Sequence, residues 1–394
     1  MTEADLESDY GPAPRRRGLR TGFTTGACAA AATRGACLAL RGERPTAVDV
    51  PLPAGFAATF QLNSLEADGC RARASVIKDA GDDPDVTHRA EIIVQVDLGA
   101  GAPDGIRRGW RVVGRGAVAR RMGAGSVLEL RAGSGVGVVT RPGLGLPVGG
   151  PAINPVPRRM IARSVREALL RPAPLVSVEV GVRDGEALAR RTLNGRLGIE
   201  GGLSILGTTG VVRPYSTASW RASVLQGVDV AAASNCEEIV ASTGGRSEAY
   251  ARRLLRGLPE VAFVEMGEFT GHVLKRARER GLRTVHLSGM IGKLSKIACG
   301  HFMTHVAGNQ VDTAYLSDLA QRAGGSPAVV DAVWRANTAR HAQELVIGAG
   351  LPAFFDLLCA DVARSCAGLV GDRPQVRVLL FDFDGRRLGA SPSQ

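Results

Sequence analysis

The stretch VAFVEMGEFTGHVLKRARERGLRTVHLSG, Val261 to Gly289, decides the fold of the C-terminal half. The apolar run Val261 to Glu265 predicts a strand, and Thr284 to Leu287 predicts the next one. Between them we expect a helix, with Thr270 as its N-cap and Gly281 just after its last turn, where glycine is favoured. A strand, a helix and a second strand in this order are typical of a βαβ unit on a parallel sheet.

The same alternation extends from about Gly201 to the C-terminus. Short apolar runs predict further strands at 203–206, 239–241 and 376–381, and longer periodic segments predict helices around 327–348 and 353–367. We therefore expect a Rossmann-like parallel-sheet α/β domain over residues 196–394.

The N-terminal half has a different pattern, in which short β-branched runs are separated by Gly, Pro and Asp turns. Strands are expected at 59–65, 71–77, 91–98, 110–118 and 127–130, with helices from Thr24-Thr25 to about Leu40 and at 157–170. This mixture predicts an α+β domain over residues 19–195. Residues 1–18 lack apolar periodicity, so a disordered tail is expected there.

Composition narrows the class of protein. A chain of 394 residues with 45% hydrophobic residues exceeds the size of one ordinary core. Its net charge of +11 fits nucleic acid or a polyanionic small molecule, but aromatics are only 4% and no zinc-finger spacing is present, so we favour the small molecule. The absence of a signal sequence, a membrane-length apolar run and C-x-x-C pairs predicts a cytoplasmic protein without membrane contact or disulfides.

Glycine- and hydroxyl-rich loops indicate where a ligand binds. Ligands of open α/β sheets lie beyond the carboxyl ends of the strands, and this rule selects loops at 207–210, 242–245, 266–270 and 288–293. The set suits an adenosyl or nucleotide cofactor, although each loop alone is also compatible with a tight turn. The predicted cofactor-binding residues are Gly207, Thr208, Thr209, Gly210, Ser242, Thr243, Gly244, Glu265, Gly267, Glu268, Ser288, Gly289, Gly292 and Lys293.

Two other motifs do not support a dinucleotide or metal site, and a third is ambiguous. The run 127–137 resembles a dinucleotide-binding glycine motif, but no helix is expected after it, so a strand-turn-strand is predicted. His301 and His305 have the i, i+4 spacing of a metal pair, yet Phe302 stands where a zincin has Glu, so no protein-bound metal is predicted. The acidic residues between Asp79 and Asp85 are equally compatible with a cation site and a solvated turn.

Five strings in series are more specific than any single motif. They are LRTGFTTGACAAAA (19–32), VIKDAGDDPDVT (76–87), GLGLPVGGPAINPVPRRMI (143–161), GGLSILGTTGVVRPYS (201–216) and GMIGKLSKIACGHFMTH (289–305). Together they closely resemble the CbiD family. One departure is Gly150, where the family string leads us to expect an acidic residue.

The resemblance implies a two-domain enzyme of cobalamin biosynthesis. Such an enzyme transfers a methyl group from S-adenosylmethionine to C1 of cobalt-precorrin-5B and gives cobalt-precorrin-6A, so cobalt enters only as part of the substrate. The macrocycle carries many carboxylates, which fits the basic chain, and arginines can bind carboxylates in bidentate fashion. The arginines of the ordered loops are Arg20, Arg141, Arg158, Arg159 and Arg213.

On this resemblance we expect the cofactor on the second domain and the macrocycle between the domains. The predicted substrate-binding residues are Thr21, Thr24, Thr25, Gly26, Lys78, Asp79, Asp82, Asn154, Arg158 and His305. No catalytic residue is assigned, because methyl transfer from a sulfonium mainly requires alignment. A dinucleotide-dependent oxidoreductase and a non-catalytic tetrapyrrole carrier remain as alternatives, and homo-oligomers or transient contacts with neighbouring pathway enzymes stay open.

Overall fold

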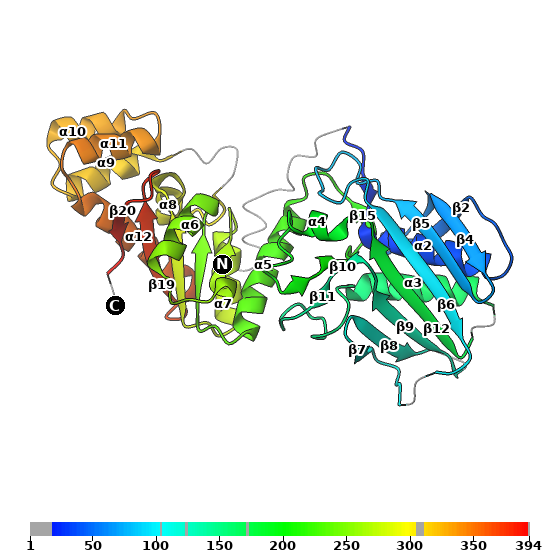
Figure 1. Ribbon diagram of the computed structural model, residues 1–394. Coiled ribbons are helices and arrows are strands. Elements are labelled where there is room, and N and C mark those ends of the chain that lie inside the picture. The colour runs from blue at the N-terminus through cyan, green and yellow to red at the C-terminus, as the bar shows by residue number, and fades with distance from the viewer. Residues whose placement is uncertain (1–17, 103–104, 123–124, 171–172, 305–310, 393–394) are drawn as a thin grey trace. The chain divides into compact units, whose positions relative to one another are not determined.

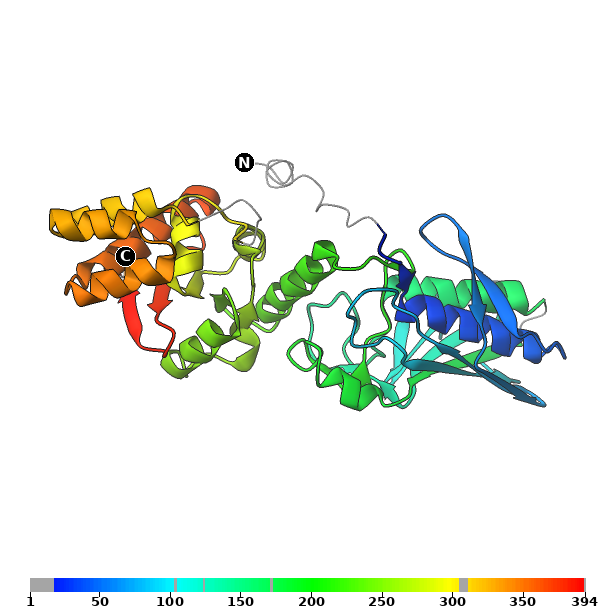
Figure 2. The same cartoon turned by 90° about the horizontal axis from the view of Figure 1, so that it is seen from above.

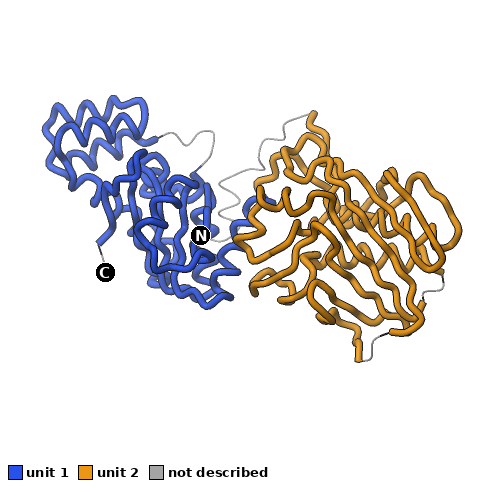
Figure 3. The backbone as a smooth tube through the Cα atoms, viewed as in Figure 1, with its two compact units in different colours: residues 1–10, 218–394 blue, residues 11–217 orange. Residues whose placement is uncertain are grey.

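The computed structural model describes residues 18–102, 105–122, 125–170, 173–304 and 311–392. It divides into two compact units, one ending at Thr217 and the other beginning at Ala218 (Figure 3). This boundary lies later than the predicted one after residue 195, because short strands between 199 and 212 pair within the N-terminal unit. The predicted tail and His305 lie outside the described residues.

The N-terminal unit is built on a seven-stranded sheet in the order β4-β5-β6-β12-β9-β8-β7 (Figure 1). The sheet strands are β4 (Ser64–Asp68), β5 (Arg71–Ile77), β6 (Glu91–Gly99), β7 (Arg111–Gly114), β8 (Ala117–Arg121), β9 (Val127–Ala132) and β12 (Leu175–Val182). The smaller strands are β1 (Gly22–Phe23), β2 (Ala47–Pro51), β3 (Ala57–Gln61), β10 (Gly135–Val136), β11 (Val138–Val139), β13 (Ile199–Glu200), β14 (Gly202–Leu203) and β15 (Val211–Val212). The helices are α2 (Thr25–Ala39), α3 (Pro155–Ala168) and α4 (Gly185–Ala189).

Helices α2 and α3 lie side by side on one face of this sheet (Figures 1 and 2). Alternate residues of β5, β6 and β12 are small or β-branched and point toward the helices, as a period of two requires. Helix α2 is almost wholly buried, and its Ala, Gly and Cys residues let the sheet and α3 approach it closely. The core of the unit is therefore the layer between the sheet and α3.

Three glycines allow β10, β14 and α4 to meet. A Cβ atom on Gly202 would lie 2.2 Å from the carbonyl carbon of Gly135, and one on Gly185 would lie 2.2 Å from the carbonyl oxygen of Gly135. Real Cβ atoms do not approach backbone so closely, so side chains are excluded at this crossing. The contact joins the chain after residue 200 to the large sheet.

The C-terminal unit has a five-stranded sheet in the order β17-β16-β18-β19-β20. Its strands are β16 (Glu238–Ser242), β17 (Phe263–Glu265), β18 (Thr284–Gly289), β19 (Gln375–Phe381) and β20 (Arg387–Ala390). Its helices are α5 (Thr217–Ala233), α6 (Gly245–Leu254), the 3-10 helix η2 (Glu260–Ala262), α7 (Thr270–Glu279), α8 (Ile291–Ala298), α9 (Thr313–Arg322), α10 (Pro327–Trp334), α11 (Ala339–Gly348) and α12 (Ala353–Val370).

The first four strands of this order are parallel, and β20 is antiparallel to β19. Both faces of the sheet are covered, as parallel strands require. In β16, Ile239 and Ala241 join the larger core with α5, α7, α8 and α12, whereas Val240 joins a smaller core with α6. The chain thus combines a mixed α/β architecture with a sheet that contains parallel strands.

Several sequence predictions are confirmed. The strand–helix–strand order over 261–289 is present, α2 and α3 lie within two residues of their predicted positions, and Gly281 has a left-handed φ of +72°. Residues 127–137 form β9 and β10 without a following helix, as expected.

Other predictions are wrong. Residues 203–206 are not a strand of the parallel sheet, because Gly202–Leu203 pairs with β10 and Ile205 bridges Ile153. The expected strand 110–118 is a hairpin of β7 and β8, turning at Gly116 with φ +71°. Thr270 is the first helical residue and Phe269 the N-cap, and in the described part the Thr270 hydroxyl has no hydrogen-bond partner.

Within the described ranges, no helix is long and apolar enough to cross a membrane. In the same ranges, no group of three or more His, Cys, Asp or Glu side chains is placed to hold a metal ion. The cysteines are free, and Cys70 is exposed.

The glycine crossing makes a prediction for stability. Gly202→Ala forces the backbone of Gly135 to move, so the free energy of unfolding should fall by about 2–3 kcal/mol. The matched control is Gly195→Ala, because a Cβ atom there meets nothing within 4 Å. Urea unfolding followed by circular dichroism measures both, and equal stabilities of the two variants would contradict the crossing.

Candidate functional site

The carboxyl ends of three parallel strands bring most of the predicted cofactor residues together. In the register of the sheet, Ser242 of β16 pairs with Glu265 of β17 on one side and with Ser288 of β18 on the other. The loops that follow these strands therefore start at one edge of the sheet. The structure places Ser242–Gly244, Glu265–Glu268 and Ser288–Lys293 at this edge, which we call the carboxyl edge.

Lys293 ties the loops of the carboxyl edge to one another. Its Nζ donates to the carbonyl oxygen of Thr243 at 2.5 Å and to that of Gly267 at 3.4 Å. Burial lowers the pKa of Lys293, and the charges of Glu268 and Glu265 oppose this shift. The lysine was predicted as a point charge for a ligand, but its ammonium group is bonded to the backbone of two loops.

The hydroxyl groups of the edge also serve the fold. Ser288 Oγ donates to the carbonyl oxygen of Ser247 at 2.9 Å, so it faces α6. The backbone NH of Thr243 donates to the carbonyl oxygen of Ser288 at 2.9 Å. Ser242 and Ser288 are fully buried. Ser288 thus fixes the loops through its hydroxyl and its backbone, whereas Ser242 does so through its carbonyl oxygen, which accepts from the NH of Met266 at 2.9 Å, and its hydroxyl has no hydrogen-bond partner among the described residues.

Two features of the edge remain open to solvent. Glu265 is exposed, and its carboxylate makes no hydrogen bond or ion pair with residues that the structure describes. A Cβ atom on Gly244 would meet nothing within 4 Å, whereas one on Gly245 would lie 3.8 Å from Glu265 Oε1. An exposed carboxylate thus lies beside open space at the start of α6.

The helices of the carboxyl edge begin differently from helices α9, α10 and α11. Helices α6 and α8 have Gly244 and Met290 at their N-caps, with no side-chain capping bond in the described structure. By contrast, α9 and α11 are capped by the side chains of Asp312 and Thr338. An uncapped N-terminus leaves backbone NH groups that can bind a ligand.

The predicted loop at 207–210 lies elsewhere, in the N-terminal unit. The NH of Thr24 donates to the carbonyl oxygen of Gly210 at 3.0 Å, and a Cβ atom on Gly207 would lie 2.4 Å from Thr24 Cβ. The placement of Gly207, Thr208, Thr209 and Gly210 on the parallel sheet is therefore wrong. The short apolar run before them resembles a strand in sequence, but it packs against α2.

The loop that begins α2 holds this segment in place. Thr24 Oγ1 caps α2 by accepting from the NH of Ala27 at 3.2 Å. Thr25 Oγ1 accepts from the NH of Leu206 at 3.0 Å, and the NH of Gly26 donates to the carbonyl oxygen of Leu206 at 3.0 Å. Thr24, Thr25 and Gly26 are buried, whereas Thr21 is exposed. Three of these four predicted substrate residues thus make contacts within the fold.

The acidic loop at 79–85 connects neighbouring segments. Asp79 pairs with Arg20, which lowers the pKa of Asp79 to about 2, chiefly through the hydrogen bond from Arg20. Asp82 Oδ2 accepts from the NH of Arg20 at 2.6 Å, and Asp83 Oδ1 accepts from the NH of Tyr215 at 2.8 Å. These carboxylates are bonded to cations and backbone NH groups of the protein, and they hold the segments around 20 and 215 to the loop.

Lys78 is the buried member of this loop. Its side chain is 1% exposed and its Nζ lies 2.7 Å from Asp85 Oδ2. Burial raises the pKa of Asp85, but the charge and hydrogen bond of Lys78 and the hydrogen bonds of Thr87 outweigh it, so the pKa lies below its ordinary value. Lys78 therefore balances a carboxylate of its own loop.

Asn154 and Arg158 belong to the start of α3. The NH of Asn154 donates to the carbonyl oxygen of Ile205 at 2.9 Å. Arg158 is buried, its Nε donates to the carbonyl oxygen of Ile153 at 2.6 Å, and burial lowers its pKa to about 10. The guanidinium group also lies 5.7 Å from the centre of the Trp110 ring. Arg158 thus points into the protein and contacts its backbone.

Of the two neighbouring arginines at the start of α3, Arg158 is buried and Arg159 is exposed. Arg159 and Arg163 line a cavity of about 210 Å³ together with Thr208. The helical period carried the necessary signal, because Arg158 shares the apolar stripe of Ile161 and Val165, whereas Arg159 and Arg163 lie off it.

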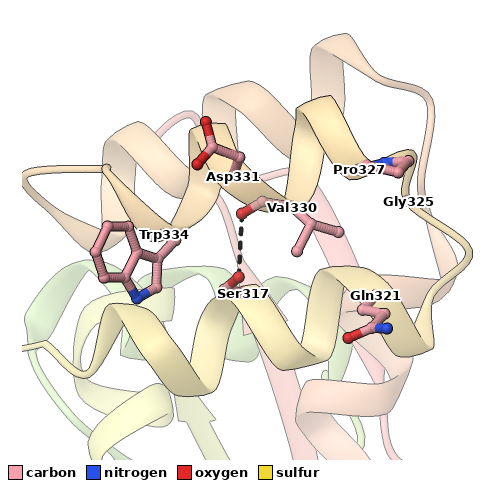
Figure 4. A pocket seen from close by; sticks show the side chains of 7 residues that line it. All are labelled: Ser317, Gln321, Gly325, Pro327, Val330, Asp331 and Trp334. Carbon is pink, nitrogen blue, oxygen red and sulfur yellow. Dashed lines mark hydrogen bonds between the residues drawn. The ribbon is translucent and has the colours of Figure 1, made fainter.

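A larger cavity of about 400 Å³ lies in the helical part of the C-terminal unit. Val330 and Trp334 of α10 face α9, and Ser317 Oγ donates to the carbonyl oxygen of Val330 at 3.0 Å (Figure 4). Asp331 is the charged residue of its lining in the described structure, and it pairs with Arg335 at 3.1 Å. This cavity offers a polyanion no cation, so we assign it no role.

The Lys78–Asp85 pair predicts a pH-dependent stability. Because the pKa of Asp85 is lower in the folded protein, the contribution of the pair is complete above the unfolded value, about 3.9, and is lost as the pH falls through the folded value. Lys78→Met should lower the free energy of unfolding at pH 7 by about 2–3 kcal/mol. This loss of stability is smaller than the loss expected for a fully buried ion pair, because the Asp85 side chain is 25% exposed.

Urea unfolding between pH 7 and pH 3 measures both effects. Lys78→Met should flatten the loss of stability below pH 4, and the double variant with Asp85→Asn should lose less than the two single variants together. An acid dependence of Lys78→Met equal to that of the wild type would refute the coupling.

Comparisons with known proteins cover both units. The model of the CbiD family matches residues 13–214, and the model of the CbiD C-terminal domain matches residues 303–392. A Thermus thermophilus protein named cobalt-precorrin-5B C(1)-methyltransferase is 48% identical over 390 residues, which cover 99% of each chain. A protein of the same name from Salinispora arenicola is 49% identical over 376 residues, 95% of this chain and 92% of the relative.

A solved structure of a cobalamin biosynthesis protein from Archaeoglobus fulgidus is 24% identical, covers 84% of this chain and 85% of that chain, and has a TM-score of 0.36. The family models and the near full-length identity to the curated relatives give the same assignment. The chain belongs to the CbiD family.

Proposed function

We propose that this protein transfers a methyl group to C1 of cobalt-precorrin-5B, giving cobalt-precorrin-6A in cobalamin biosynthesis. The observation that carries the proposal is the 48% identity over 99% of both chains to a relative named for this activity. The match includes both compact units, which supports assigning the whole activity to this chain.

We place the methyl donor, S-adenosylmethionine, on the carboxyl edge of the C-terminal unit, and we regard its sheet as Rossmann-like. Support comes from the register that aligns Ser242, Glu265 and Ser288, and from the uncapped start of α6. Bound there, the donor supplies an electrophilic methyl group on a sulfonium. Glu265 would accept hydrogen bonds from ribose hydroxyls, and the backbone around Gly244 would contact the ligand closely.

The residues present fit this donor. Glu265 is exposed and has no partner among the described residues, and the space in front of Gly244 is open. Lys293 holds the loops of Thr243 and Gly267 together, so it acts as a positioning residue. The buried serines do the same through the backbone. Of the predicted cofactor set, Glu265 and Gly244 are therefore the direct contacts we propose.

We place the macrocycle on the N-terminal unit. The segment 206–210 lies against the start of α2 and near Asn154, and it now belongs to the acceptor site instead of the donor site. Thr208 and Thr209 are exposed, as is Thr21. Thr24, Thr25, Gly26 and Lys78 would act indirectly, by fixing the loops on which the exposed groups stand.

The chemistry demands little acid–base work from the protein. Methyl transfer from a sulfonium to an electron-rich carbon is an in-line displacement, so alignment and exclusion of water provide the main acceleration. Loops fixed by buried hydrogen bonds, such as those of Thr25 and Lys293, supply that alignment at no cost when the substrates bind. A base among these residues is not required.

The alternatives make different demands. A dinucleotide-dependent oxidoreductase would use the carboxyl edge for a nicotinamide cofactor, and a tetrapyrrole carrier would need no donor site. The exposed Glu265 suits either ribose-containing cofactor, so the edge alone does not separate them, whereas the names of the full-length relatives favour methyl transfer. Cytoplasmic location, homo-oligomers and contacts with neighbouring enzymes stay predictions.

The donor site predicts the effect of filling the space at Gly244. Its φ of 172° is extended backbone, and a Cβ atom meets nothing within 4 Å, so Gly244→Val should fold normally. The added side chain would occupy the ligand's place and weaken binding of S-adenosylhomocysteine by at least about 10-fold, or about 1.4 kcal/mol. Titration calorimetry measures the affinity.

Gly257→Val is the matched control, since a Cβ atom there also meets nothing within 4 Å and the residue lies before β17, at the opposite end of the sheet. Its affinity should equal that of the wild type. Undiminished binding by Gly244→Val would exclude the carboxyl edge as the donor site.

The activity itself is tested by isotope transfer. Incubation of the protein with S-[methyl-CD3]-adenosylmethionine and cobalt-precorrin-5B should add one labelled methyl group to the macrocycle, and Gly244→Val should slow this reaction. Mass spectrometry of the macrocycle measures the transfer. Reduced nicotinamide consumed without label transfer would favour the oxidoreductase, and neither change would favour the carrier.

A further inference from the structure

A small cavity beside Thr208 combines an apolar lining with two cations. It has a volume of about 210 Å³, and its lining includes Leu52, Met160, Arg159 and Arg163 as well as Thr208. All of these residues belong to the N-terminal unit. Pockets that enclose whole drug-sized molecules are larger, about 300–1,000 Å³, so this one can receive only an edge of a large ligand.

The two arginines come from successive turns of one helix. Arg159 and Arg163 are four residues apart on α3, which places them on the same face. Arg163 is already paired, because its Nε lies 2.5 Å from Glu167 Oε1. Arg159 is exposed and makes no hydrogen bond or ion pair with residues that the structure describes. The positive charge available to a ligand is therefore that of Arg159.

The rest of the lining is suited to a ring. This part of the lining includes Pro51, Leu52 and Pro53, from the end of β2 onward, and Val156 and Met160 of α3. These side chains offer apolar contacts. Thr208, in the segment that links β14 to β15, adds a hydroxyl group. A ligand that matches this lining carries an anionic group on an apolar, ring-shaped edge.

We propose that this cavity binds one carboxylate-bearing pyrrole edge of the macrocycle, with Arg159 recognising the carboxylate. The inference rests on the proposed function, because it assumes a polycarboxylate tetrapyrrole as acceptor. Of the loop arginines that the sequence offers to the carboxylates, it selects Arg159, and it gives Thr208 a place at the acceptor. Arg159 is a binding residue that contributes to substrate affinity.

The test compares two arginines of the same helix in the full-length protein. Arg159→Gln removes the cation of the cavity, whereas Arg166→Gln removes an exposed cation of α3 that is not part of its lining. The probe is uroporphyrin, a tetrapyrrole with eight carboxylates, and its octamethyl ester is the uncharged comparison. Porphyrin fluorescence measures the dissociation constants.

Arg159→Gln should weaken uroporphyrin binding about 10-fold, the effect of losing one charge-assisted hydrogen bond. Arg166→Gln should change it less than about 2-fold, as expected for a remote charge screened by salt. Arg159→Lys should give an intermediate affinity, since lysine keeps the positive charge but lacks the planar guanidinium group that binds a carboxylate through two hydrogen bonds. The octamethyl ester should not distinguish the variants, and S-adenosylhomocysteine should bind all of them equally.

Equal weakening by Arg159→Gln and Arg166→Gln would overturn the proposal, because it would show only a general effect of net charge. With cobalt-precorrin-5B, Arg159→Gln should raise KM about 10-fold and leave kcat nearly unchanged. Absence of methyl transfer by the wild type would refute the proposed function, whereas a selective loss of uroporphyrin binding in Arg159→Gln would still support the carboxylate site.

Discussion

Helix α2 packs against the seven-stranded sheet, α3 and the β2–β3 hairpin, and all of its residues except Arg34 and Leu38 are buried. A helix packed in this way has room for few large side chains, which explains its run of Ala, Gly and Cys. Its first turn has backbone NH groups that need partners inside the protein. Thr24 supplies one, and the carbonyl oxygen of Leu206 supplies another to Gly26. The position of the segment 206–210 therefore follows from the burial of α2.

Because buried segments need hydrogen-bond partners inside the protein, several polar residues that resemble ligand contacts in the sequence serve the fold instead. Thr25, Lys78 and Arg158 look like ligand contacts in the sequence because hydroxyls, lysine and arginine bind anions. In the structure each is buried and bonded to carbonyl, amide or carboxylate groups of the chain. Leaving such buried groups without partners would cost about 1–3 kcal/mol each, so their bonds within the fold are part of its stability. The exposed groups beside them are the ones free to meet a substrate.

Sequence reasoning located the βαβ elements of residues 261–289 and the edge to which their loops belong, because strand and helix periodicity and Gly281 are local signals. It failed where pairing between distant segments decides the structure. Nothing local distinguishes Ile205, which bridges Ile153, from a residue of a parallel strand. The burial of Arg158 and the exposure of Arg159 had a local signal, since the apolar stripe of α3 contains the first and excludes the second.

The two proposed sites also differ in charge in the way that their ligands require. At the carboxyl edge, Glu265 is exposed and Glu268 is buried nearby, and the charges of both oppose the lowering of the Lys293 pKa by burial. A cationic sulfonium is favoured there, and the neutral thioether left after transfer is favoured less. In the N-terminal unit, Arg159 offers an uncompensated positive charge, which suits a polycarboxylate both before and after it gains a methyl group. On electrostatic grounds alone, the affinity for the donor would thus fall once its methyl group is transferred. The interaction of Arg159 with the macrocycle carboxylate would be the same before and after the reaction.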